Sequence, residues 1–419
     1  MSLMGKIGRL LRSGTVSALC LLALSAPVVA LGAEGVSDED NARFQTFIST
    51  FRSEVLAEGV TAETYDLAMS GLSPNVRVVE LNNSQPEFVR PMWEYIDGAV
   101  SERRLELGRE QIDANAQLFD RLEATYGVPR QVLAAIWGME SNFGRNMGGM
   151  NLFQALATLA YDGRRQDFGK SQLIAALKIS QQEGIPPSEM TGSWAGAFGH
   201  TQFIPTTFLA HAVDGDGDGK RDLWHSSADA LASAASYLQR SGWSGDRDWG
   251  FEVALPEDFN YEQANADDER TLSAWAALGL KRINGDPLPL GDMEAEVLLP
   301  VGANGPAFLI TQNFGAIMAY NSATSYALAI SVLSDRLRGR PGIIGAWPYG
   351  EEQLNLAQRI ALQEGLEQLG YDTGGADGII GPNTRAAIRE FQRTRGMTPD
   401  GFPSATLLTR LLNERQTQR

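Results

Sequence analysis

A glutamate on the apolar face of a predicted helix is the feature that most constrains this chain. Residues 128–144 carry apolar side chains at helical spacing, start with a Val-Pro step that suits a first turn, and end in glycine. Glu140 lies four residues after Ile136 and three after Trp137, so it projects from the apolar face. Because desolvation disfavours a charged carboxyl, we expect Glu140 to hold its proton to higher pH than a free glutamate and to act as a general acid. The alternative is a glutamate near a helix end whose charge reaches solvent.

The first residues have the layout of a secretory signal peptide. Three basic residues precede an apolar run over residues 16–30, and small residues follow it. The run is short for a membrane span and is interrupted by a serine and a proline, which favours removal over retention as an anchor. We therefore predict a signal peptide over residues 1–33, with cleavage after Ala30 or Ala33, and no stable membrane insertion afterwards.

The charge and cysteine content limit the partners and chemistry of the mature chain. The 419 residues carry a net charge of −16, and loss of the basic leader would make the chain more acidic. This argues against nucleic acid or an anionic membrane surface as the main partner, and is compatible with a neutral or mildly charged polymer. Cys20, the only cysteine, lies in the leader, so we expect an exported monomer without disulfide or thiol chemistry.

The apolar pattern predicts a mainly α (α+β) protein. The only clear strand signal is a hairpin formed by residues 294–300 and 307–310, which predicts a small sheet. The predicted helical regions are 38–122, 128–144, 172–179, 228–238 and 314–337.

A Gly- and Pro-rich stretch divides the chain into two predicted domains. We predict a catalytic domain over residues 34–340, a linker over 341–350 and a small binding domain over 351–419. The last has a three-helix pattern, and its small size makes binding a better expectation than catalysis. Its predicted helices are 351–369, 383–395 and 404–412.

A second stretch suited to chemistry is residues 193–205, where glycine and alanine alternate with aromatic residues. Small residues let a backbone approach a ligand closely while aromatic rings form walls. Gln202 can donate and accept hydrogen bonds, as recognition of sugar hydroxyls and acetamides requires. The alternative is close packing of elements by small residues.

Together these stretches resemble the lysozyme-like lytic transglycosylases, and most closely the family of membrane-bound lytic transglycosylase B. The resemblance begins with Glu140-Ser141 in its apolar helix and continues through Ala195-Gly-Ala-Phe-Gly-His200-Thr-Gln-Phe-Ile-Pro205. Further supporting blocks are Tyr161-Asp-Gly-Arg164-Arg165, Asn313-Phe314, Tyr320-Asn321-Ser322 and Tyr326-Ala327. It covers about residues 38–337.

The resemblance implies a lysozyme-like helical catalytic domain that acts on peptidoglycan glycan strands. The family cleaves the β-1,4 bond between N-acetylmuramic acid and N-acetylglucosamine and leaves a 1,6-anhydro end. Glu140 would be the single acid/base, with Ser193 near its carboxyl group. Two arginines would meet acidic groups of the substrate, although a solvated basic pair is the simpler interpretation. The implied substrate-binding residues are Ser193, Gln202, Phe203, Tyr320, Asn321, Tyr326, Arg164 and Arg165.

The number of carboxyl groups is compatible with this mechanism. An ordinary glycosidase needs two carboxyl groups at the scissile bond. The motifs contain no acid besides Glu140 except Asp162 and Asp167, which stand among arginines. The resemblance implies that the muramic acetamide assists in place of a second carboxylate. Two alternatives remain open: a hydrolytic muramidase in which Asp162 or Asp167 activates water, and a non-catalytic cell-wall-binding scaffold.

Residues 214–224 form an EF-hand-like loop. Aspartates at loop positions 1, 3 and 5 with glycine at position 6 suit a hard cation, but His225 stands where a bidentate glutamate is usual. The resemblance implies that a later aspartate completes the site. We expect structural calcium and no cofactor for catalysis, the alternative being a solvated Asp-Gly turn. The predicted ligands are Asp214, Asp216, Asp218, Lys220 and Asp229.

The C-terminal region resembles peptidoglycan-binding domains. Tethering to the wall would raise the concentration of substrate at Glu140, and we expect a periplasmic protein if the source is a bacterium with two membranes. A generic three-helix bundle is the alternative. The resemblance is carried by Leu369-Gly370-Tyr371, Asp377-Gly378, Gly381-Pro382-Asn383-Thr384-Arg385, Phe391-Gln392 and Asp400-Gly401.

Overall fold

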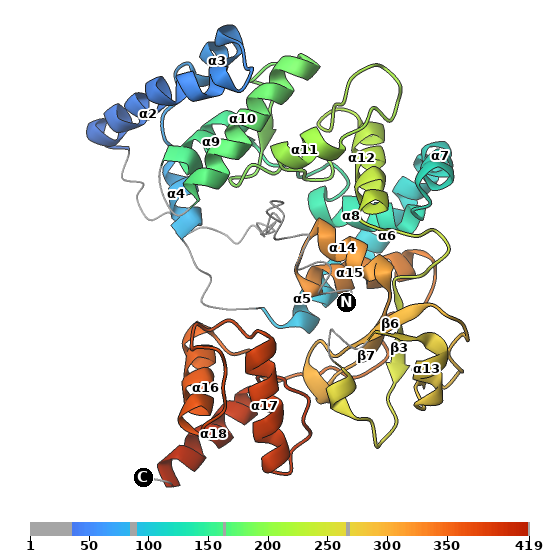
Figure 1. The fold of residues 1–419 in the computed structure, drawn as a ribbon. Coiled ribbons are helices and arrows are strands. Elements are labelled where there is room, and N and C mark those ends of the chain that lie inside the picture. Colours follow the sequence, from blue (N-terminus) through green and yellow to red (C-terminus); the bar gives the residue numbers. More distant parts are fainter. Residues whose placement is uncertain (1–35, 84–89, 162–164, 265–268, 418–419) are drawn as a thin grey trace. The chain divides into compact units, whose positions relative to one another are not determined.

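The computed structural model of the chain describes residues 36–83, 90–161, 165–264 and 269–417, which fall into two compact units (Figure 1). The helical unit contains residues 36–83, 102–161 and 165–241, and the sheet unit contains residues 90–101, 242–264 and 269–417. The predicted catalytic domain therefore contributes to both units. The predicted signal peptide lies outside the described residues.

The helical unit is built almost entirely of helices around a core that includes four fully buried phenylalanines, Phe44, Phe119, Phe153 and Phe208. In it α9 and α10 lie side by side (Figure 1). Its elements are α2 (Asp38–Ala57), α3 (Ala62–Met69), α4 (Val76–Asn83), α6 (Glu102–Ala114), α7 (Ala116–Tyr126), α8 (Arg130–Ser141), β1 (Met150–Asn151), α9 (Leu152–Tyr161), α10 (Gln166–Glu183), β2 (Thr191–Gly192), α11 (Pro205–His211) and α12 (Ser227–Arg240).

The sheet unit combines a small antiparallel sheet with helices. Its elements are α5 (Met92–Ala99), β3 (Gly250–Ala254), η2 (Tyr261–Gln263), β4 (Arg270–Thr271), α13 (Leu272–Ala277), β5 (Lys281–Arg282), β6 (Glu294–Leu298), η3 (Gly302–Asn304), β7 (Ala307–Ile310), α14 (Gln312–Tyr320), α15 (Thr324–Leu337), α16 (Leu356–Gln368), α17 (Pro382–Thr394) and α18 (Ala405–Thr417). The mainly α prediction with a small sheet is confirmed.

The predicted hairpin is confirmed, but the sheet is larger than predicted. Strands β6 and β7 pair antiparallel with Val297 opposite Leu309, within a five-stranded order β4-β6-β7-β3-β5. Strands β4 and β5 have two residues each, which is too short to produce an alternating pattern in the sequence. One face of the sheet packs on Trp275 and neighbouring apolar side chains.

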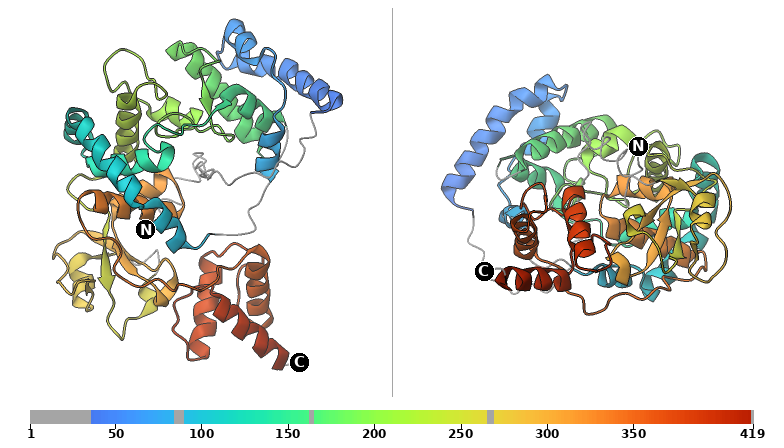
Figure 2. Two further views of the ribbon diagram at one scale, coloured as in Figure 1. Left: turned by 180° about the vertical axis from the view of Figure 1, so that it is seen from behind. Right: turned by 60° about the horizontal axis from the view of Figure 1, so that its bottom comes forward.

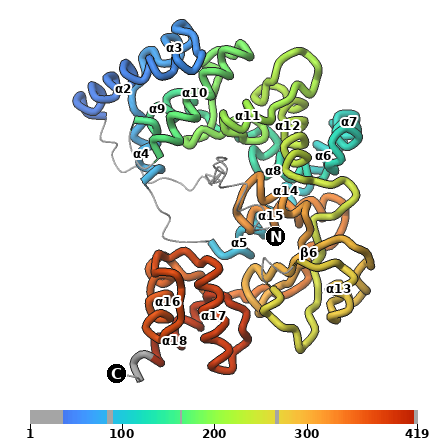
Figure 3. Tube along the Cα trace, viewed as in Figure 1, coloured from blue at the N-terminus to red at the C-terminus, as the bar shows by residue number. Residues whose placement is uncertain are grey.

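The predicted helical region over residues 314–337 consists of two helices. Helices α14 and α15 are separate and bent by 117° at the break, which can be followed in Figure 3. Asn321 is extended at φ −146°, and its side-chain oxygen accepts the N–H of Ala323 at 3.0 Å. This local side-chain bond competes with continuation of the helix. No single helix in the described ranges is long and apolar enough to cross a membrane, whereas this bent pair passes that test together.

The C-terminal three-helix bundle, red in Figure 2, has its own core of Leu362, Leu366, Ile388, Phe391 and Leu411. Its first helix starts later than predicted, at α16. The reason is a capping box in which the Asn355 side chain accepts the N–H of Gln358 and the Gln358 side chain accepts the N–H of Asn355.

The segment before the bundle is held against the sheet. Both carboxylate oxygens of Glu252 on β3 accept backbone N–H groups, from Ile344 at 2.8 Å and from Gly345 at 2.6 Å. Burial raises the pKa of Glu252, and these two bonds act against that rise. Trp347 packs against Trp93 of α5 with ring centroids 6.3 Å apart. The predicted linker is therefore anchored along part of its length.

Candidate active site and metal site

Glu140 lies at the C-terminal end of α8 and is buried. Pro129 precedes the helix, and the backbone N–H of Arg130 donates to the Glu123 carboxylate at 2.7 Å, which caps the first turn. Every residue from Val132 to Ser141 is buried, and Glu140 itself is only 7% exposed. The predicted helix and the burial of its glutamate are thus confirmed. A carboxyl in this position is shielded from bulk water and suited to general acid chemistry.

The chain turns sharply immediately after this helix. Asn142, Phe143 and Gly144 have consecutive left-handed conformations, with φ of 49°, 59° and 80°. The N–H of Phe143 bonds to the carbonyl of Trp137 at 3.2 Å, and a Cβ on Gly138 would lie 2.7 Å from the Phe143 ring. Only glycine at position 138 allows that ring to fold back onto the helix. Such strained conformations persist when surrounding contacts over-determine them, and they cluster at functional sites.

The second predicted stretch folds into a tight loop beside this turn. Ser193 closes it, because its N–H donates to Ala197 O at 2.7 Å and its hydroxyl accepts the Ala197 N–H at 3.0 Å. Gln202 is left-handed at φ 50°, and its side-chain nitrogen donates to Met147 O at 3.1 Å and to Gly199 O at 2.9 Å. The amide donors of Gln202 therefore join this loop to the segment that follows Glu140. A role of Gln202 in sugar binding stays a prediction.

The sequence interpretation missed His200, which bonds to the helix that carries Glu140. Its ring nitrogen Nδ1 accepts the indole N–H of Trp137 at 3.1 Å, and its backbone oxygen accepts the Ser141 hydroxyl at 2.6 Å. A search of the sequence for metal-ligand spacing cannot detect such a residue, because its partners are 63 and 59 positions away.

The remaining predicted substrate-binding residues are distributed over the molecule. Phe203 is buried and its ring contacts Tyr237 edge-on, with centroids 6.0 Å apart. Tyr320 is the last residue of α14, Asn321 directly follows that helix, and Tyr326 lies in α15. All three belong to the sheet unit, whereas Glu140 belongs to the helical unit. Their role in sugar binding stays a prediction.

The predicted basic pair and its neighbouring acids give less information. Arg164 and Asp162 lie outside the described residues. Arg165 precedes α10, with its guanidinium 4.9 Å from the centroid of the Phe168 ring. Asp167 is exposed in the first turn of α10. A binding role for the arginines stays a prediction.

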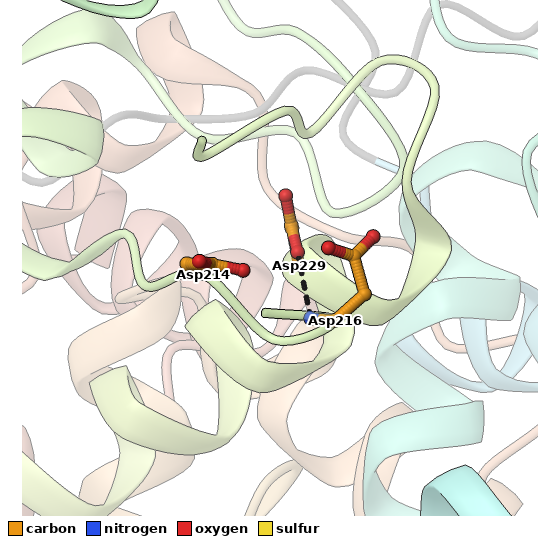
Figure 4. A group of neighbouring side chains, drawn as sticks. All are labelled: Asp214, Asp216 and Asp229. Atoms are coloured by element: carbon orange, nitrogen blue, oxygen red, sulfur yellow. Dashed lines mark hydrogen bonds between the residues drawn. The ribbon is translucent and has the colours of Figure 1, made fainter. Parts of the chain in front are cut away.

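Three of the predicted metal ligands converge. One carboxylate oxygen from each of Asp214, Asp216 and Asp229 lies within 4.8 Å of the others (Figure 4). Asp229 stands in the first turn of α12 and is only 1% exposed. Its carboxylate accepts the N–H groups of Gly215 at 2.8 Å and Asp222 at 2.7 Å. Burial raises the pKa of Asp229 despite these bonds, so a cation here would favour its ionised form.

Hydrogen bonds within the loop hold its exposed aspartates in place. Asp214 accepts the N–H groups of Gly217 and Gly219, and the bond from Gly219 is the main reason that the pKa of Asp214 is lowered. The Asp218 carboxylate lies outside the three-residue group and accepts the N–H of Lys220 at 2.8 Å. The ring nitrogen Nδ1 of His225 forms a hydrogen bond with Oδ2 of Asp222 at 2.8 Å. Three converging carboxylates form an all-oxygen donor set, which fits a hard cation such as calcium.

The acidic loop and the loop around Gln202 are joined directly. The backbone N–H of His200 donates to Leu223 O at 2.9 Å. Trp224 stacks on Phe198 with ring centroids 4.1 Å apart and planes at 3°. Its indole N–H donates to Thr191 O at 2.7 Å. Order in the acidic loop therefore supports the loop that contacts the Glu140 helix.

Comparison with known proteins assigns the chain to a protein family. Residues 43–335 match the family of the transglycosylase SLT domain, which is more than half of the chain. The chain belongs to this family. Residues 355–411 match the peptidoglycan binding domain. The predicted resemblance to lytic transglycosylases and to peptidoglycan-binding domains is confirmed, while the predicted domain boundaries stay predictions.

Individual relatives agree with the family. Membrane-bound lytic murein transglycosylase B of Escherichia coli K12 is 34% identical over 219 residues, which cover 50% of this chain and 57% of that protein. The crystal structure of Pseudomonas aeruginosa SltB3 in complex with NAG-anhNAM-pentapeptide is 48% identical with a TM-score of 0.86, over 88% of this chain and 99% of that one. Escherichia coli Slt35 in complex with calcium is 26% identical with a TM-score of 0.59, over 71% and 93% of the respective chains.

Proposed function

We propose that this chain is a peptidoglycan lytic transglycosylase in which Glu140 is the single acid/base. Protonated Glu140 donates to the glycosidic oxygen that leaves, while the acetamide of N-acetylmuramic acid assists at C1. The resulting carboxylate takes the proton from the C6 hydroxyl, and that oxygen bonds to C1. A 1,6-anhydro end forms without consumption of water. The burial of Glu140 at the end of α8 is the observation that carries this proposal.

The relatives support the same reaction class. One matched structure holds NAG-anhNAM-pentapeptide, whose sugar has the anhydro form expected of the product. The match to the Escherichia coli protein covers 57% of its length, so the activity of the whole relative is carried over as part of this proposal. The proposed substrate-binding residues within this chain are Ser193, Gln202, Phe203, Tyr320, Asn321 and Tyr326.

The rival reactions differ in their products. A hydrolytic muramidase would need a second carboxyl group, and Asp167 is the described candidate. It is exposed at the start of α10, where a helix N-terminus stabilises its charge. A non-catalytic scaffold would release no fragments.

The acidic loop would hold calcium in a structural role. Support comes from the three converging carboxylates and from the calcium complex of a related structure. Asp214, Asp216 and Asp229 would be the carboxylate ligands, with Asp218 and the carbonyl of Lys220 as further oxygen donors. Bound calcium would neutralise charge in the loop and so stabilise it next to His200.

The C-terminal bundle would bind peptidoglycan and raise the concentration of glycan near Glu140. Its match to the peptidoglycan binding domain supports this role. The leader over residues 1–33 would direct the chain to the periplasm, where it would act as a monomer on the cell wall.

Digestion of purified sacculi followed by mass spectrometry of the muropeptides tests the function. Anhydro-muramyl products, each one water molecule lighter than reducing-end products, are expected. Products with reducing ends would instead indicate a hydrolytic muramidase. Sacculi that stay intact would indicate a non-catalytic scaffold. The same digestion with Glu140→Gln links the outcome to the proposed acid/base.

A further inference from the structure

We propose that His200 is a positioning residue that holds the last turn of α8, and with it the Glu140 carboxyl, in its working orientation. The inference rests on the proposed role of Glu140. His200 contacts the helix on both sides of that residue, through Trp137 three positions before it and through Ser141 one position after it.

The contact with Trp137 requires one particular form of the imidazole ring. An indole nitrogen can only donate, so Nδ1 of His200 must accept and its ring proton must be on Nε2. The two rings also meet edge-on, with centroids 5.7 Å apart and planes at 69°. A protonated imidazolium would present an N–H to the indole N–H, and the bond would be lost.

Ser141 makes the second contact and extends it into the turn. Its hydroxyl donates to the backbone oxygen of His200 at 2.6 Å and accepts the N–H of Gly144 at 2.9 Å. One hydroxyl thus joins the end of α8, the left-handed turn and the His200 backbone. A bond to a backbone oxygen survives replacement of the His200 side chain, so it separates the role of the ring from that of the loop.

The turn is shaped to receive this ring. A Cβ on Gly144 would lie 2.3 Å from Cε1 and 2.4 Å from Nδ1 of His200, distances that side chains do not tolerate. Gly144 also has φ of 80°, which glycine adopts without strain. The ring therefore packs directly on the backbone of the segment that follows Glu140, in a space that only glycine leaves open.

The surroundings favour the neutral imidazole. Burial lowers the pKa of His200, and the charge of Asp222 acts in the opposite direction while that of His225 adds to the lowering. The two groups that α8 presents to it, the Trp137 indole and the Ser141 hydroxyl, are neutral. On its other side, the His200 backbone N–H is held by Leu223 O. A histidine that served only to fill the core would need neither a fixed tautomer nor a glycine against its ring.

The test compares two replacements of His200. Asparagine keeps an oxygen acceptor near the position of Nδ1, whereas leucine fills similar space without an acceptor. On soluble uncrosslinked glycan strands, we expect His200→Leu to lower kcat roughly 10- to 100-fold with little change in KM, because small misplacement of a catalytic group is costly. His200→Asn should stay within about threefold of the wild-type kcat. Equal losses in both variants, or no loss in either, would overturn the proposal.

A double-mutant cycle and a spectroscopic readout complete the test. Trp137→Phe removes the indole donor, so adding it to His200→Leu should cost little more than either change alone; fully additive losses would contradict the proposed bond. In ¹⁵N-labelled protein, the Trp137 indole resonance should shift as His200 titrates, and this shift should vanish in His200→Asn. A Trp137 resonance that does not change as His200 titrates would refute the contact between the two side chains. This result is independent of the digestion experiment, in which a lack of anhydro products would refute the function proposed for Glu140.

Discussion

Two loops of the helical unit, one of which directly follows the catalytic candidate Glu140, are stabilised by different chemistry. The turn at residues 141–147, after Glu140, is held by a hydroxyl, an indole, an imidazole and an amide, all of them neutral. The loop at residues 214–224 is held by aspartate carboxylates that accept backbone N–H groups. The first arrangement pairs neutral donors with neutral acceptors, whereas the second concentrates negative charge. We therefore expect a cation to bind at the second loop and not at the first.

The two loops also share a boundary. The carbonyl of Leu223 and the ring of Trp224, at the end of the acidic loop, hold His200 and Phe198. A cation in the acidic loop would thus support the turn after Glu140 through packing, without taking part in the reaction.

Glu140→Gln should give the largest effect, because it removes the single carboxyl group that donates and accepts protons in the proposed mechanism. We expect release of anhydro-muropeptides to fall at least about 10²-fold, within the usual range for loss of a general acid or base. The melting temperature should change little, since the two side chains have the same shape. Glu110→Gln, on the exposed face of α6, serves as the control and should retain full activity. An active and folded Glu140→Gln would eliminate the mechanism.

Calcium binding to the acidic loop should give the second-largest effect, a rise in melting temperature. At a free calcium concentration of about 100 times Kd, binding would stabilise the folded chain by about 2.7 kcal/mol, which should appear as a higher melting temperature that a chelator reverses. Asp229→Asn should abolish that shift, because it removes a buried ligand. Asp113→Asn, exposed on α6, should leave it intact. An unchanged melting temperature of the wild type on calcium addition would argue that the loop binds no calcium.

Gly144→Ala sharpens the comparison by adding a methyl group to the neutral turn. We expect a loss of about 1–3 kcal/mol in the free energy of unfolding, because φ is 80° and the new Cβ would meet the His200 ring. Gly217→Ala in the acidic loop is the matched control, with φ of 84° and nothing within 4 Å of its Cβ. It should cost only the backbone strain, about 1 kcal/mol. Equal losses in urea titrations of the two variants would remove the argument for a close-packed ring.

The pH dependence of stability should be the smallest effect and should differ between the loops. Burial lowers the folded-state pKa of His200 and His211, so below the unfolded value of about 6.5 the unfolded chain binds more protons. Their contribution to stability is complete above that pH and declines as the pH falls through the lowered folded values. Asp229, whose pKa is raised, acts in the opposite sense: its contribution is present at low pH and lost as the pH rises through the folded value. Melting curves of His200→Asn should show a weaker acid decline than the wild type, and an identical decline would contradict this assignment.

Short-range patterns allowed much of the fold and part of the site to be predicted. Helix α8 and the burial of Glu140 follow from apolar spacing within a dozen residues, and the hairpin of β6 and β7 follows from alternation around one turn. The acidic loop could be identified from the spacing of its first aspartates alone. Patterns failed where elements were too short or uniformly apolar, as in β4 and β5 and at the break after Tyr320.

The sequence by itself determined that Glu140 belongs to an apolar helical face and that Asp214, Asp216 and Asp218 share one loop. Helix periodicity and loop spacing are local properties of the chain. Only the tertiary structure decided that the His200 ring lies on Gly144 and accepts the indole proton of Trp137. It also decided that the Asp229 carboxylate is buried under the backbone N–H groups of Gly215 and Asp222. The contacts of His200 join residues about 60 positions apart, and their geometry depends on how packed elements exclude water, which no local pattern encodes.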